Sequence, residues 1–292
     1  MKNEERLINK IKRILRIIGC PRWLHHFGPK KYLFADHILA LLVKQECRLG
    51  YRRISNILRA LGIKCPCYSA LWHCMNKIKF NLWPKILNAT RDLKSYIVAL
   101  DGTGMSRPLP SPYYYRRIDK PYPVEIPLKL SIAVDTKTKK ILALRLRAKR
   151  AHDIKDAQYL VRRLPKTEWV VADKGYDADS LHTFCKSKKI KCCIAIRDYG
   201  KSKNKRHTLR RENQSNMHHK RYHRREIVES VFKAMKTKYG PSLNSIKISA
   251  QRAEIYCRAI AHNLFSYFPR LFKRSPFIDN FYKECCFSFS NG

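Results

Sequence analysis

The chain has 292 residues, with 62 Lys and Arg against 22 Asp and Glu, which gives a formal net charge of +40 at pH 7. This excess of positive charge is far beyond what solubility needs and fits a polyanionic partner. The eleven cysteines are odd in number and scattered, and the sequence lacks a secretion signal and an uninterrupted apolar span, which speaks against a disulfide framework and a membrane protein. We therefore expect a cytoplasmic protein with reduced thiols and no membrane partner.

Residues 1–92 show helical periodicity and contain no convincing strand. A basic amphipathic helix is predicted over Leu7–Ile18, a second helix over Phe34–Leu49, and a helix, a glycine turn and another helix over residues 51–80. The last pair has the layout of a helix-turn-helix DNA reader, although many packed helix pairs also have glycine in the turn. We expect a helical N-terminal domain for DNA binding or dimerisation. The pattern leaves sequence-specific reading and simple packing both open.

Four potential zinc ligands lie close together within this region. Their spacing, with one residue between the first two and none between the last two, fits the usual zinc intervals poorly. Zinc binding and plain reduced thiols are the two interpretations, and we favour the thiols. The four residues are Cys65, Cys67, His73 and Cys74.

Two short apolar runs in the rest of the chain each end in an aspartate. Tyr96–Leu100 precedes Asp101, and Trp169–Ala172 precedes Asp173. Each run is rich in β-branched or aromatic residues and is followed by glycine, so each predicts a buried strand that stops near the acid. Neighbouring strands lie about 4.8 Å apart, so carboxylates at adjacent strand ends can share divalent cations roughly 3.5–4 Å apart. Aspartate after a strand is more often a turn former or helix cap, which is our interpretation for Asp135, Asp153 and Asp156.

The segments around these runs predict a mixed α/β domain. Leu128–Val134 and Ile141–Leu146 read as a hairpin, Ile154–Leu164 and Asp179–Lys188 as helices, and Cys192–Ile196 as a further strand. The order is strand, hairpin, helix, strand, helix, strand, helix, with the two acids on the first and fourth strands.

A later helix carries a polar stripe suited to phosphate chemistry. Tyr222, Arg225, Glu229 and Lys236 fall within a sector of about 60° on a helix. The opposite face is apolar and can pack on a sheet. A basic amphipathic helix with one glutamate on its solvent side is the alternative interpretation. The apolar face consists of Ile227, Val228, Val231, Phe232 and Met235.

Just before this helix, residues 201–225 contain ten Lys or Arg and four His against one acid, Glu212. We expect a segment that becomes ordered on a DNA backbone, with a merely solvated charge run as the alternative. Earlier in the chain, Tyr113, Tyr114 and Tyr115 follow the first acid. They are candidates for stacking on bases of opened DNA ends, or for half-buried packing.

Three motifs in this order match one family. The third-acid segment Y-x2-R-x3-E-x6-K is satisfied from Tyr222 to Lys236, A-D-K-G-Y-D stands at Ala172–Asp177, and D-G-T-G at Asp101–Gly104 is followed by the Pro/Tyr/Arg-rich Ser111–Arg117. Over roughly residues 96–268 the chain resembles the DDE transposases of bacterial and archaeal insertion sequences, in the broad insertion-sequence four and five groups.

The resemblance implies an α/β fold with a ribonuclease-H-like mixed sheet flanked by helices, beside the all-α N-terminal part. The catalytic domain would cover residues 96–272, with a basic insertion at about 198–221, and residues 273–292 would form a tail. Asp101, Asp173 and Glu229 are expected to be catalytic and to ligate two Mg²⁺, with Mn²⁺ as a substitute. The residues expected to hold DNA are Tyr222, Arg225, Lys236, Arg221, Arg224 and Lys174.

The activity implied by the resemblance is metal-dependent cleavage and transfer of DNA strands at the ends of an insertion sequence. The implied partners are double-stranded DNA, both the terminal inverted repeats and the target, and a second copy of the chain in a homodimer on the nucleoid of a prokaryotic cell. A structure-selective nuclease that cuts without joining, and a repurposed DNA-binding protein without catalysis, are the alternatives.

Overall fold

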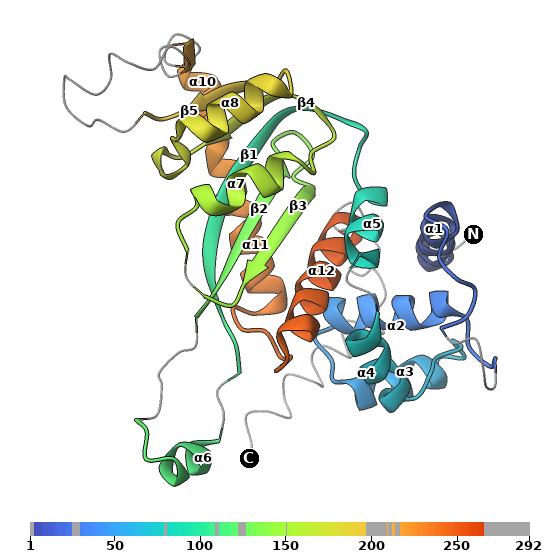
Figure 1. The fold of residues 1–292 in the computed structure, drawn as a ribbon. Helices are drawn as coiled ribbons and strands as arrows, with labels where there is room; N and C mark the ends of the chain where they lie inside the picture. The colour runs from blue at the N-terminus through green and yellow to red at the C-terminus, as the bar shows by residue number, and fades with distance from the viewer. Residues whose placement is uncertain are drawn as a thin grey trace.

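The computed structural model of the protein describes residues 3–24, 30–78, 81–108, 111–121, 127–149, 151–196, 209, 212–213 and 217–265. A central sheet is flanked by helices on both faces, and the N-terminal helices gather beside one end of it (Figure 1). Within the described ranges, no helix has the length and apolar character needed to cross a membrane.

The N-terminal region is helical, as predicted. Helix α1 spans Asn3–Ile17, α2 Phe34–Glu46, α3 Tyr51–Ala60, α4 Tyr68–Lys77 and α5 Leu82–Ala89. Most of α2 is buried because apolar residues occur on nearly all of its sides. Residues 61–67 join α3 to α4, a connection longer than the turn of about three or four residues in a helix-turn-helix. Reading of DNA sequence by this pair stays a prediction.

The sheet contains five strands in the order β3-β2-β1-β4-β5. Strand β1 pairs antiparallel with β2 and parallel with β4, while β2 pairs antiparallel with β3 and β4 parallel with β5. This is the predicted ribonuclease-H-like arrangement, with the hairpin and the two acid-bearing strands in their expected places. The bounds are β1 Lys94–Ser106, β2 Pro127–Asp135, β3 Ile141–Arg147, β4 Lys166–Ala172 and β5 Lys191–Ile194.

One strand prediction was wrong in its extent. Strand β1 does not stop near Asp101 but continues through both glycines of the first motif to Ser106. The continuation is possible because β2 still pairs with this segment, from Ile132 opposite Asp101 to Pro127 opposite Ser106. Strand β4 ends at Ala172, so Asp101 lies where β1 loses one of its two neighbours. The prediction of Asp135 as a turn former is confirmed, since its Oδ2 accepts a 2.7 Å hydrogen bond from the Thr138 N–H.

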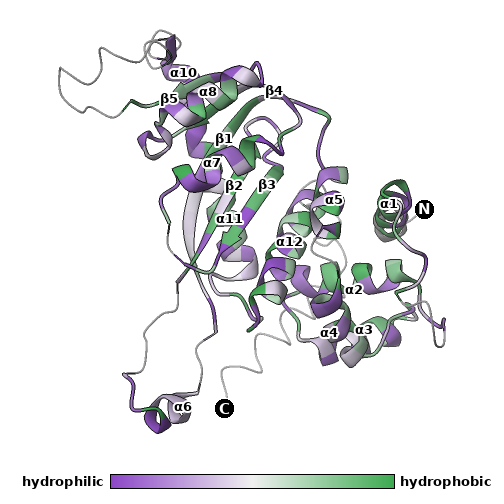
Figure 2. Ribbon diagram, in the orientation of Figure 1, coloured by the Kyte–Doolittle hydropathy of each residue, from purple (hydrophilic) through white to green (hydrophobic). Residues whose placement is uncertain are grey.

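Helices cover the two faces of the sheet separately. On one face, α7 (Ile154–Val161) and α8 (Asp179–Ser187) pack against one apolar cluster. On the other, α11 (Glu226–Tyr239) and α12 (Ile248–Phe265) belong to a larger cluster. Apolar residues concentrate along the strands between these layers (Figure 2). The described chain also contains the short elements α6 Pro112–Arg117, η1 Lys174–Tyr176, α10 His219–Tyr222 and η2 His223–Arg225.

The larger cluster also takes in the N-terminal helices. Helix α12 packs against α2, α4 and α5 on one side and against β3 on the other. Apolar residues of α2, α4 and α5 therefore share one buried cluster with those of α11 and α12. The N-terminal helices therefore contact the sheet layer through α12. A domain boundary near residue 92 stays a prediction.

Asn263, a buried polar residue of α12, ties that helix to the backbone of β3. Its Oδ1 accepts from the Ile141 N–H at 2.8 Å, and its Nδ2 donates to the Ile141 carbonyl and to Thr90 Oγ1, each at 2.9 Å. Asn263 is 2 % exposed, so water cannot replace these bonds.

Substituting Asn263→Ala should lower the free energy of unfolding by about 3 kcal/mol, because the buried N–H and C=O of Ile141 would lose their partners. Urea denaturation measures the change, with Asn56→Ala on the exposed side of α3 as the control that should stay near wild type. A loss below about 1 kcal/mol for Asn263→Ala would contradict this role.

Candidate active site

Asp101 and Asp173 lie abreast on neighbouring strands. The parallel register pairs Leu100 of β1 with Ala172 of β4, and each aspartate is the next residue of its chain. Adjacent strands are about 4.8 Å apart, so the two acids start from backbone positions of that separation. The predicted pairing of the two acid-bearing segments is therefore found in the sheet.

Both carboxylates belong to the face of the sheet that α11 covers. Side chains alternate between the faces of a strand. Ala99 and Val171, each two residues before an aspartate, lie in the cluster that α11 and α12 bury. Leu100 and Ala172 lie in the opposite cluster, under α7 and α8. Asp101 and Asp173 thus follow the alternation toward the helix that carries Glu229.

Glu229 lies in the first turn of α11 and is joined to Arg225. The Arg225 Nη1 donates to Glu229 Oε1 at 2.8 Å, across one helical turn. Burial lowers the pKa of Arg225, but the charges of Glu229, Tyr222 and Asp173 raise it overall. Arg225 is therefore close to the acid that directly follows β4 and to an acid of α11. The single helix predicted from Tyr222 to Lys236 is divided, since Tyr222 ends α10, Arg225 belongs to η2 and α11 begins at Glu226.

The surroundings of Asp101 disfavour the ionised form of its carboxylate. Burial raises its pKa to about 6, with further contributions from the negative charges of Asp153 and Glu229, and only the Gly102 N–H and Arg225 lower it. Its Oδ1 accepts the Gly102 N–H at 2.7 Å, and Asp173 Oδ1 accepts the Lys174 N–H at the same distance. A nearby cation would stabilise the ionised form of carboxylates in such surroundings.

The donor set fits a hard divalent cation, because carboxylate oxygens are the ligands that Mg²⁺ prefers. In the described part of the chain, no three His, Cys, Asp or Glu side chains are already arranged to hold one ion.

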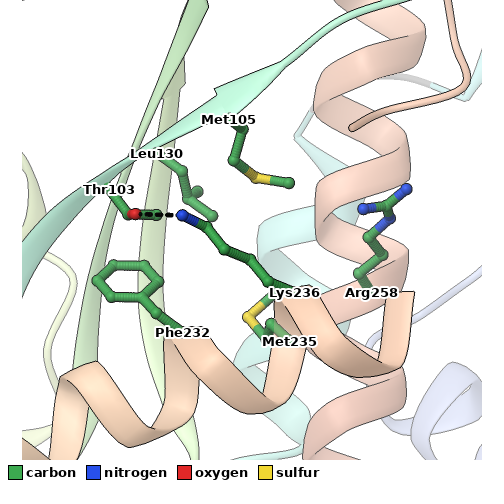
Figure 3. Close-up of a pocket in the computed structure, with 7 residues that line it drawn as sticks. All are labelled: Thr103, Met105, Leu130, Phe232, Met235, Lys236 and Arg258. Carbon is green, nitrogen blue, oxygen red and sulfur yellow. Dashed lines mark hydrogen bonds between the residues drawn. The ribbon is translucent and has the colours of Figure 1, made fainter. Parts of the chain in front are cut away.

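The cations predicted to bind DNA occupy different surroundings. Lys236 donates to Thr103 Oγ1 at 2.8 Å in a small pocket between α11 and β1 (Figure 3). Arg221 lies 3.6 Å from the centre of the Trp169 ring, so it also holds α10 on β4. Tyr222 is half-buried, whereas Arg224 and Lys174 are exposed. Contacts of these residues with DNA stay predictions.

Two acids that we interpreted as caps or turn formers have other roles. Asp153 stands at the N-cap position of α7 but makes no cap hydrogen bond, and its Oδ1 lies 2.6 Å from Lys129 Nζ. Asp156 is fully buried and bonded to Ser131 Oγ at 2.8 Å and Arg147 Nε at 2.5 Å. Sequence gave no sign of either contact, because each joins segments distant in the chain.

Other predicted features lie away from the acids. Tyr113 and Tyr114 of α6 are 72 % and 46 % exposed, and α6 stands apart from the sheet (Figure 1). Near α4, Cys65 and Cys74 are buried, and Cys67 Sγ lies 3.2 Å from Ser69 Oγ. Most of the predicted basic insertion and all of residues 273–292 fall outside the described residues.

Comparison with known families decides the assignment. Residues 92–264, more than half of the chain, match the family described as "Transposase DDE domain". The chain belongs to this family. It is therefore a transposase, as the three acid motifs predicted, and the match contains all three proposed acids. We found no match among curated proteins.

Solved structures show distant likenesses. A chain of the piggyBac transposase synaptic complex with hairpin DNA is 11 % identical, with coverage of 96 % of this chain and 82 % of that chain and a TM-score of 0.41. A chain of the Mos1 strand transfer complex is 12 % identical, with coverage of 83 % of this chain and 78 % of that chain and a TM-score of 0.29. A chain of the simian T-cell lymphotropic virus intasome in complex with PP2A regulatory subunit B56 gamma is 12 % identical. It has coverage of 74 % of this chain and 66 % of that chain and a TM-score of 0.32. The fold assignment rests on the strand order of the sheet, not on these values.

The raised pKa of Asp101 predicts a pH-dependent stability in the absence of divalent cations. The folded state holds this proton more tightly than the unfolded state, so the contribution is fully present below the ordinary pKa near 4 and is lost as the pH rises through about 6. Asp101→Asn should therefore become more stable than wild type by about 1–2 kcal/mol at pH 7 but not at pH 4. Denaturation in EDTA measures the difference, and the same gap at both pH values would contradict it.

Arg221, which packs on Trp169, and the exposed Arg224 together test whether this packing stabilises the protein. Arg221→Ala should lower the free energy of unfolding by about 1 kcal/mol, because it loses the stacking on Trp169. The exposed Arg224→Ala should leave it within about 0.5 kcal/mol of wild type. Equal effects of the two substitutions in thermal denaturation would show that the Trp169 contact does not stabilise the protein.

Proposed function

We propose that this transposase cuts and joins DNA at the ends of its own mobile element, with Asp101, Asp173 and Glu229 as ligands of two Mg²⁺ ions, for which Mn²⁺ can substitute. The observation that carries the proposal is the adjacent register of Asp101 and Asp173 on the face covered by the helix of Glu229. We infer that the three acids, which come from separate segments, converge near the carboxyl end of β4.

When bound, the ions would supply Lewis acidity that lowers the pKa of an attacking water or 3′-hydroxyl and stabilises the leaving oxygen. The attacking oxygen forms a new bond to phosphorus while the bond to the leaving oxygen breaks and that oxygen takes the electron pair. In strand transfer, the 3′-hydroxyl of the element end takes the place of water. The chemistry then requires the chain to fix the scissile phosphate against the three acids.

Arg225 is suited to that positioning. One of its N–H groups serves Glu229, and a guanidinium has five N–H donors, so the same side chain can hold Glu229 and a phosphate oxygen together. Tyr222 lies one turn before it in the chain, where its ring is 5.9 Å from the Arg225 guanidinium carbon. We infer that this pair orients the DNA backbone at the acids.

The binding of DNA rests on charge. The formal net charge of +40 provides the sequence-independent attraction to phosphates. Arg224 and Lys174 are exposed on the segments that carry Arg225 and Asp173, so they extend this attraction to the edge of the site. We propose that the N-terminal helices contribute further contacts with the terminal repeats or the contact between two copies in a homodimer. The site of action would be the prokaryotic nucleoid.

The decisive substitution is Glu229→Gln, which keeps the side-chain volume but removes the charge that a cation needs. Cleavage of DNA that carries the element's terminal repeats, in Mg²⁺, should fall at least about 100-fold, while binding of the same DNA persists. Gel assays of strand cleavage, strand transfer and DNA binding give the three readouts.

The control is Glu226→Gln, which changes an exposed acid of the same helix and should leave cleavage unchanged. Retained cleavage in Glu229→Gln would remove Glu229 from the site. Cleavage by the wild type without any joined product would instead favour a nuclease, and binding without cleavage would favour a DNA-binding protein.

A further inference from the structure

Each of the two aspartate motifs contains a glycine that lies against Asp153. A Cβ added at Gly102 would lie 2.6 Å from Asp153 Oδ1, which is closer than real contacts allow, and 3.1 Å from Lys129 Cε. A Cβ at Gly175 would lie 3.4 Å from Asp153 Oδ2. Neither glycine has a positive φ, so the backbone conformation does not demand glycine at these positions. The Asp153 carboxylate therefore occupies the space in front of both glycines.

Asp153 is held in that space by Lys129. The carboxylate lies 2.6 Å from Lys129 Nζ, and the same ammonium also donates to the Ala151 carbonyl. The Lys129 side chain is only 12 % exposed and comes from β2, where it pairs in register with Gly104 of β1. An ammonium with so little exposure needs a partner for its charge, so the ion pair fixes the Asp153 carboxylate beside β2.

The Asp153 carboxylate lies on the opposite side of the strands from Asp101 and Asp173. Asp101 and Asp173 face α11, whereas Gly102 follows the alternation toward α7, the helix that Asp153 precedes. Gly102 directly follows Asp101, and Gly175 is two residues after Asp173, so the Asp153 oxygens lie against the backbone beside both acids. This contact fixes the spacing of the two motifs.

We propose that Asp153, held by Lys129, is a positioning residue of the cation site, which sets the placement of Asp101 and Asp173 through Gly102 and Gly175. The inference rests on the proposed function, since it assigns cations to those acids. Partners in the second coordination shell of a metal typically change its affinity by about 10–100-fold.

The positioning role is tested by Mn²⁺ binding to the full-length protein without DNA, measured by titration calorimetry. The double variant Lys129→Met/Asp153→Asn removes the ion pair without changing the net charge and without leaving an unpaired buried cation. It should bind Mn²⁺ about 10-fold more weakly than wild type. Wild-type affinity in this variant would overturn the positioning role, provided that Asp101→Asn lowers the affinity.

The contact with glycine is tested by thermal unfolding, which needs no activity. Gly102→Ala should lower the unfolding midpoint by about 5 °C, because its Cβ meets the Asp153 oxygen. Gly104→Ala, where an added Cβ meets nothing within 4 Å, should leave the midpoint unchanged. Asp153→Ala should relieve this contact: Gly102→Ala made in the Asp153→Ala protein should lower the midpoint much less, relative to Asp153→Ala alone, than Gly102→Ala does relative to wild type.

These measurements distinguish a failure of the proposed cation site from a failure of the positioning role of Asp153. Equal Mn²⁺ affinity of wild type and Asp101→Asn would overturn the proposed cation site, whatever Asp153 does. A tolerated Gly102→Ala, or a loss that Asp153→Ala fails to relieve, would overturn the positioning role while the proposed function stands.

Discussion

Parallel pairing of β1 with β4 is the interaction on which the site depends. It places Asp101 and Asp173 at the same height and on the same face, because each directly follows a paired residue of its strand. A slip of one residue would turn one carboxylate toward α7, away from Glu229. The register is secured by side chains on both faces of these strands, which lie in two separate apolar clusters. The geometry of the acids is thus a consequence of the core.

The same geometry costs stability. Burial and neighbouring acids raise the pKa of Asp101 to about 6, so its ionised form is disfavoured in the folded protein. The positive charge of Arg225 offsets part of this rise in the pKa of Asp101, and Lys129 pairs with Asp153. Acids kept close together against their mutual repulsion are a common feature of sites whose function is to bind cations. In this protein the cost is met by a large core that includes the N-terminal helices.

Features with local, periodic signals could be predicted from the sequence. The β-branched run before Asp173 formed the expected strand, and the segment with Glu229 and Lys236 formed the expected helix. The predicted helix was wrong in its extent, because Tyr222 ends α10 and Arg225 belongs to η2. The extension of β1 to Ser106 could not be predicted, because it depends on pairing with β2. The contact of Asp153 with Gly102 joins residues far apart in the chain and leaves no periodic trace. The packing of Arg221 on Trp169 is of the same kind.

The most direct test of the central claim is a structure of the protein bound to terminal-repeat DNA and Mn²⁺, with the ions located by anomalous scattering. The account predicts two Mn²⁺ ions whose ligands include Asp101, Asp173 and Glu229, at oxygen distances of about 2.2 Å. Ions held by other residues, or one of the three acids facing away at roughly 10 Å while the others bind, would contradict it.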